Sequence, residues 1–93
     1  PATTEKVLIE LATNATTYAA YNQCAKSPYA TEGSLVFLAK KCADAHDLEW
    51  LEKIGINILE NPATTEKVLI ELAAFNCPTV SKLAHEKLEN TIQ

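Results

Sequence analysis

PATTEKVLIELA, at Pro1–Ala12, is the stretch that decides the fold of this chain, because it returns unchanged at Pro62–Ala73. A weaker copy lies between them at Pro28–Ala39, PYATEGSLVFLA, and keeps the proline, one threonine, the glutamate, both leucines and the final alanine. Units of unequal length that open on such a stretch are typical of helical solenoids, in which each unit is one supersecondary element. The sequence therefore predicts a single domain with repeats at residues 1–27, 28–61 and 62–90.

Each copy of this stretch predicts an amphipathic helix. Pro1 suits a position outside or at the first turn of a helix, and Thr3, like Thr64 in the second copy, is expected to cap the N–H groups that follow. The apolar residues that come next share one face at the 3.6-residue period: Val7, Leu8, Leu11 and Ala12. Ile9 points off this face, and we expect it to touch the next unit.

A second helix is predicted after each copy. The first spans about residues 16–26, the second about residues 47–60 with Asp47 as N-cap, and the third begins near Pro78. The small residues Gly55 and Ala84 are expected to let neighbouring backbones approach closely. The other positions expected to be buried on these helices are Thr17, Ala20, Tyr21, Cys24, Ala25, Leu48, Leu51, Ile54, Ile58, Leu59, Val80, Leu83 and Leu88.

The composition excludes several classes of partner. The chain has 93 residues, is 47% hydrophobic and carries a formal net charge of −4, with its basic residues scattered apart from the pair Lys40-Lys41. Binding to the phosphate backbone needs clustered basic residues, so we expect no nucleic-acid partner. No apolar run approaches the roughly 18–20 residues of a membrane span, so we expect no membrane partner.

The three cysteines, Cys24, Cys42 and Cys77, are an odd number at wide spacing. This favours a reducing compartment, the cytoplasm, over a disulfide framework, and the spacing favours neither a metal site nor a cofactor. Cys42 and His46 are four residues apart, as a nucleophile and its base can be. The residues between them predict a loop, so we expect no enzyme, and a cysteine-dependent enzyme is the weakest alternative.

The outward positions of the second helices are the candidate partner-binding face. They are Tyr18, Asn22, Gln23, Trp50, Lys53, Ile56, Asn57, Lys82 and His85. Trp50 either fills the space created by the longer second unit or stands exposed as an anchor for a partner. The whole face is equally compatible with an ordinary solvated ridge.

The run Asn61-Pro62-Ala63-Thr64, followed by Leu69 and Leu72-Ala73, resembles the leucine-rich variant repeat, whose units carry an Asn-Pro-x-Thr turn and a Leu-x-x-Leu-Ala core. Ser27-Pro28 takes the place of Asn-Pro in the first turn. The longer second helices are more similar to HEAT repeats. The resemblance implies an all-α, α-α superhelical solenoid of about three helix pairs that serves as a scaffold for a protein partner. A nucleic-acid-binding helical repeat is the alternative.

The ends of such an array are expected to remain apolar. We expect them to pack on further units of a longer chain, or end to end on other copies of this one, through Val7, Ile9, Val80 and Ile92.

Overall fold

The computed structural model describes residues 2–43 and 47–92, and it is all-helical over these two ranges. Six α-helices make up most of them: α1 (Ala2–Asn14), α2 (Tyr18–Lys26), α3 (Glu32–Cys42), α4 (Leu48–Glu60), α5 (Glu66–Ala73) and α6 (Pro78–Ile92). The predicted all-α class is therefore confirmed. The starts predicted for α4 and α6 are confirmed as well, whereas α2 begins two residues later than expected because Thr17 is its N-cap.

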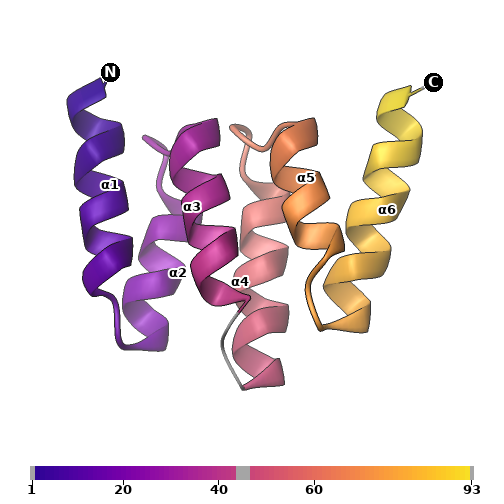
Figure 1. Ribbon diagram of the computed structural model, residues 1–93, viewed down its shortest axis with the longest axis horizontal. Helices are drawn as coiled ribbons and strands as arrows, with labels where there is room; N and C mark the ends of the chain where they lie inside the picture. The colour runs from indigo at the N-terminus through magenta and orange to yellow at the C-terminus, as the bar shows by residue number, and fades with distance from the viewer. Residues whose placement is uncertain (1, 44–46, 93) are drawn as a thin grey trace.

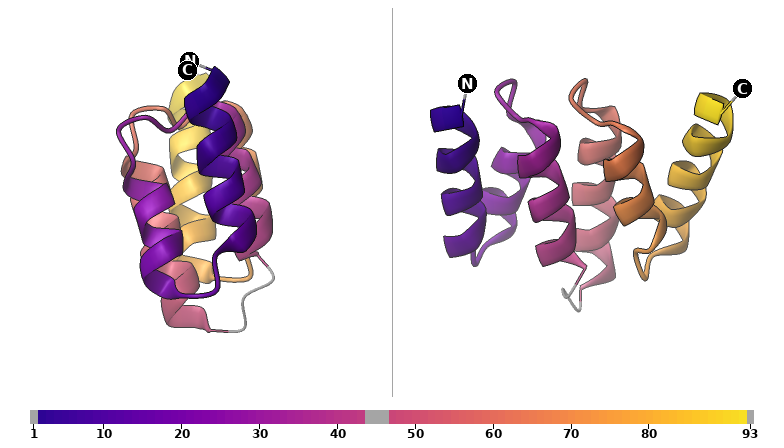
Figure 2. Two further views of the ribbon diagram at one scale, coloured as in Figure 1. Left: turned by 90° about the vertical axis from the view of Figure 1, so that its left-hand side faces the viewer. Right: turned by 45° about the horizontal axis from the view of Figure 1, so that its top comes forward.

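The helices lie in two rows. In the first row α1 contacts α3 and α3 contacts α5, and in the second row α2 contacts α4 and α4 contacts α6. Figure 1 shows α1 at one end of the molecule and α6 at the other, and the left view of Figure 2 shows the rows end-on. The shortest extent of the molecule, 16 Å, fits two packed helices whose axes lie about 8–10 Å apart.

The core fills the space between the rows. Its largest fully buried side chains come from four helices: Leu35, Leu38 and Cys42 of α3, Leu51, Ile54 and Ile58 of α4, Val68 and Leu72 of α5, and Val80 of α6. The prediction for Leu48 was wrong, since this side chain is 58% exposed. Leu48 is the first residue of α4 and directly follows the N-cap Asp47, so it lies beyond the edge of the core.

The starts of α1 and α5 differ from those that the predicted caps imply. Thr3 lies inside α1, which begins at Ala2, and the N-cap of α5 is Thr65 rather than Thr64. The Thr64 hydroxyl instead donates to the carbonyl of Ile58 in the last turn of α4. Thr64 therefore satisfies the end of the preceding helix, and the capping predictions for Thr3 and Thr64 were wrong.

Asn61 joins two successive turns. Its side-chain Nδ2 donates to the carbonyl oxygens of Ala25 at 2.9 Å and Ser27 at 3.1 Å, and its Oδ1 accepts from the N–H of Ala63 at 2.9 Å. Ser27, in the equivalent place of the first turn, accepts from the N–H of Tyr29 in the same way. The buried amide thus ties the α4–α5 turn to the α2–α3 turn.

The side chain of Val80 packs closely on Gly55 where α4 meets α6. A Cβ atom built on Gly55 would lie 2.6 Å from Cγ2 and 2.8 Å from Cγ1 of Val80, well inside van der Waals contact. Gly55 thus makes room for the side chain of Val80, and Ala84 is fully buried as well. Val80, which was expected at an open end, is fully buried instead, because it fills the space left by Gly55.

Candidate partner-binding surface

Three aromatic side chains cluster where α2 packs on α4. The ring centroid of Trp50 lies 5.9 Å from that of Tyr18 and 5.9 Å from that of Tyr21, both in tilted or edge-on geometry. Such edge-to-face pairs are favoured by the aromatic quadrupole. All three rings are half-buried and pack against the core on one side. Trp50 is thus held by its neighbours while part of its ring remains accessible.

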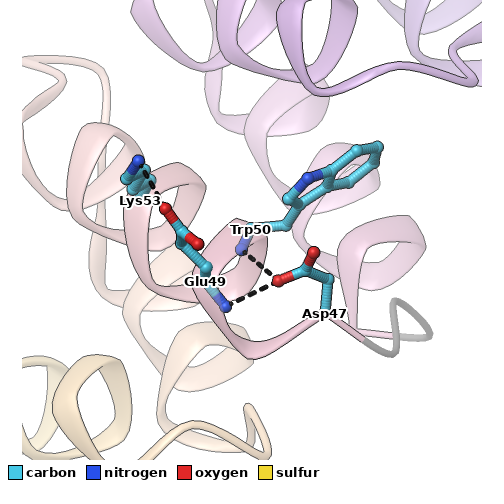
Figure 3. A network of polar contacts seen from close by, with 4 residues as sticks. All are labelled: Asp47, Glu49, Trp50 and Lys53. Carbon is cyan, nitrogen blue, oxygen red and sulfur yellow. Dashed lines mark hydrogen bonds and ion pairs between the residues drawn. The ribbon is translucent and has the colours of Figure 1, made fainter.

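The first turn of α4 fixes the position of Trp50. The Asp47 carboxylate accepts hydrogen bonds from the backbone N–H of Glu49 at 2.9 Å and of Trp50 at 3.3 Å, as Figure 3 shows. An N-capping carboxylate satisfies donors that the helix leaves unpaired. Asp47 was predicted as this cap, and the prediction is confirmed.

A charged pair borders the aromatic cluster. Lys53 Nζ lies 2.8 Å from Glu49 Oε1, one helical turn away, and 5.9 Å from the centroid of the Tyr18 ring. The hydrogen bond to Glu49 is the main cause that raises the pKa of Lys53 above its ordinary value. Lys53 therefore presents a positive charge beside an aromatic face at neutral pH.

These side chains line a hollow of about 190 Å³, formed by Tyr18, Asp47, Glu49, Trp50 and Lys53. Pockets that hold small-molecule ligands usually enclose about 300–1,000 Å³. The hollow is therefore too small for a typical cofactor, but it can receive one side chain of a partner.

Two larger hollows lie beside the turns that Asn61 connects. One, of about 380 Å³, is lined by residues 25–28, 57 and 60–62, and the other, of about 400 Å³, by residues 59, 61, 62, 64, 69, 87 and 90. Neither lining contains an aromatic side chain, and both are open depressions between turns. They offer less of the rigid apolar contact that anchors a partner than the hollow at Trp50 does.

Five of the candidate residues predicted for the partner-binding face lie together. Tyr18 and Trp50 belong to the aromatic cluster, and Lys53 borders it. Asn57 Nδ2 of α4 donates to Asn22 Oδ1 of α2 one or two turns further along. The others are separate: Gln23 is exposed on α2, Ile56 is half-buried on α4, and Lys82 and His85 are exposed on α6.

Sequence reasoning did not place Tyr21 and Glu49 at this surface. Tyr21 was assigned to the buried face of α2, yet it is half-buried and touches Trp50. Its spacing of three residues from Tyr18 puts the two side chains on neighbouring parts of one helix face, which is the signal that points to it.

The pair Lys40-Lys41 is engaged within the chain. Lys41 Nζ donates to the carbonyl oxygens of Ala12 and Thr13 at the end of α1, and lies 5.7 Å from the centroid of Tyr21. Lys40 Nζ lies 3.9 Å from Glu71 Oε1 of α5. Both lysines thus connect α3 to its neighbours in the first row.

The cysteines are buried and unpaired. Cys24, Cys42 and Cys77 all occur as free thiols. Burial is the main cause that raises the pKa of Cys42 to about 12, with the nearby Cys24 contributing, so its thiol is protonated at neutral pH. His46, its predicted base, lies outside the described residues. Within residues 2–43 and 47–92 no group of three or more His, Cys, Asp or Glu side chains is arranged to hold a metal ion.

Comparisons with protein-family models, curated proteins and solved structures found no match to this chain. In the described part of the chain, every helix is too short or too polar to cross a lipid bilayer.

Proposed function

We propose that this chain is a non-enzymatic helical-repeat scaffold whose α2–α4 surface binds a protein partner. The observation that carries the proposal is the hollow beside Trp50. Tryptophan and tyrosine dominate the binding energy of protein interfaces, because they offer a large contact area for few rotatable bonds. A partner would place one apolar side chain in the hollow lined by Trp50 and Tyr18, with Lys53 at the edge of the contact.

The repeat nature of the scaffold is supported by polar contacts that recur between neighbours in the first row. Thr31 Oγ1 before α3 donates to Glu5 of α1, and Thr65 Oγ1 before α5 donates to Glu32 of α3. Thr31 and Thr65 hold the same place in their units, as do Glu5 and Glu32. This equivalence supports an α-α superhelical solenoid of about three helix pairs, similar to leucine-rich variant and HEAT-like repeats.

The two rival functions have weaker support. A nucleic-acid-binding repeat would use Lys40 and Lys41, but these contact Glu71 and the end of α1 in a chain of net charge −4. A cysteine-dependent enzyme would need a thiolate, and the Cys42 thiol is buried with its pKa at about 12. The unpaired thiols also support the cytoplasm as the compartment.

The test uses the only tryptophan of the chain as its own reporter. Phage-displayed peptides are selected on the wild-type chain, and the enriched peptides are titrated in solution while Trp50 emission is recorded. We expect a change in Trp50 emission, and an affinity loss of at least about tenfold for Tyr18→Ala, since removal of a binding hot spot costs more than about 1.4 kcal/mol.

Tyr29→Ala is the matched control, because Tyr29 is 70% exposed and lies away from the cluster. Its affinity for the peptides should equal that of the wild type, and circular dichroism should show intact helices in both variants. Peptides that bind both variants equally, that leave Trp50 emission unchanged, or that fail to enrich at all would refute the proposal.

A further inference from the structure

The two identical copies of PATTEKVLIELA are buried differently. In α1, Val7 and Leu11 are 49% and 47% exposed, whereas their counterparts in α5, Val68 and Leu72, are both fully buried. Because the residues are the same, the difference comes from the helices that pack around each copy. Each copy is followed by a second-row helix, and α6 contacts α5 more extensively than α2 contacts α1, which accounts for part of the difference.

A second difference lies on the preceding side. α5 packs on α3, while α1 has no first-row helix before it within the described residues. Val68 and Leu72 are therefore the positions by which a first-row helix packs on its predecessor. Leu38 of α3 holds the position of Leu72, and it is fully buried as well, as expected for a helix with neighbours on both sides.

The opposite side shows the reverse pattern. Ile9 of α1 is half-buried where α3 follows, and its counterpart Ile70 of α5 is 55% exposed where no first-row helix follows in the described chain. Ile70 is thus the position by which a first-row helix receives its successor.

We propose that a second copy of this chain docks its α1 beside α5 of the first, head to tail. The contact continues an interface that exists twice within the chain, as α1 with α3 and α3 with α5. The receiving helix, α5, has the same sequence as α1, which contacts the helix that follows it, α3. The docking helix, α1, has the same sequence as α5, which packs on the helix that precedes it, α3. Both halves of the interface are therefore present, and the inference does not depend on the proposed function.

The assembly is open and weak. A head-to-tail contact uses a different surface on each copy, so it leaves one free end of each kind and can extend. Only the α5 half of the receiving end is available, because α6 packs on both α4 and α5 and buries Val80. Association is therefore expected in the range of about 10 µM to 1 mM.

The test is analytical ultracentrifugation of the whole chain over that concentration range, with one charge placed at each end. Leu11→Glu disables the docking end and Ile70→Glu disables the receiving end, and both side chains are exposed enough for the helices to remain folded. The wild type should form species larger than dimers as the concentration rises. Each variant alone should stay monomeric, and an equal mixture of the two should form a dimer and nothing larger.

The mixture separates this arrangement from the others. A symmetric α1-to-α1 contact would be lost in Leu11→Glu, retained in Ile70→Glu, and unaffected by mixing, and that result would overturn the proposal. Association that survives both substitutions would also overturn it. So would a wild-type chain that stays monomeric throughout, since the exposed faces would then belong to a different occupant.

Discussion

Replacing Gly55 with alanine tests the packing of α4 on α6. Gly55 is buried in α4, and the added methyl group would lie 2.6 Å and 2.8 Å from the two methyl groups of Val80. Because Val80 is itself fully buried, it has no free space into which to retreat. We therefore expect α4 and α6 to move apart locally.

The size of the effect follows from two opposing contributions. Alanine in place of glycine inside a helix stabilises by about 0.5–1 kcal/mol, while overpacking a well-filled core costs about 1–3 kcal/mol. The net change is a loss of about 1 kcal/mol in the free energy of unfolding, within a range of about 0–2.5 kcal/mol. For a domain of 93 residues each kcal/mol lowers the melting temperature by about 4–8 °C.

The assay is urea unfolding followed by Trp50 fluorescence, with Gly33→Ala as the matched control. Gly33 is exposed in α3, and its added methyl group would meet the carboxylate of Glu5, the far end of a flexible side chain that can turn away. This control should be close to neutral, because the gain in helix stability from alanine is offset by the loss of the hydrogen bond that the Thr31 hydroxyl donates to this Glu5 carboxylate. Val80→Ala should offset part of the cost of Gly55→Ala, with a coupling of at least about 0.5 kcal/mol in the double-mutant cycle. A Gly55→Ala variant as stable as the control would refute the described contact.

Two further predictions concern buried polar groups. Asn61→Ala removes the amide that joins two turns and should lower the free energy of unfolding in urea by about 1–3 kcal/mol. Asn90→Ala, at an exposed position, is the control and should change stability little. Equal losses of stability in the two variants would contradict the role of Asn61. Burial raises the pKa of Cys42 from 9.0 to about 12, so the unfolded chain loses this proton at lower pH than the folded one. Stability should therefore fall as the pH rises from about 9 to 12, by about 1.4 kcal/mol at pH 10, and Cys42→Ala should show a shallower pH dependence.

The sequence was sufficient for the helices but not for their surroundings. The spacing of leucines and alanines, the cap Asp47 and the position of Pro78 predicted where most helices lie. Val7 was expected at an open end of the array and is 49% exposed, whereas the identical residue Val68 is fully buried against its neighbours. Local pattern determines which face is apolar, and the position in the row determines whether that face is covered.

The same limit applies to the candidate surface. Tyr18 and Trp50 were predicted for the partner-binding face from helical spacing, but their mutual contact depends on how α2 and α4 are aligned, which no spacing within one helix specifies. Lys41 was interpreted as half of a basic pair. Its contacts with Ala12 and Thr13 join residues almost thirty positions apart, so only the packing of α3 on α1 reveals them.

The central claim is that two identical segments occupy different places in one stacked array. The direct measurement is the free energy of unfolding of Leu11→Ala and of Leu72→Ala, compared with the wild type at a concentration where the chain is monomeric. Leu72 is fully buried and its truncation should cost about 2–5 kcal/mol, whereas truncation of the half-exposed Leu11 should cost less than about 1 kcal/mol. Equal losses for the two variants would contradict the account.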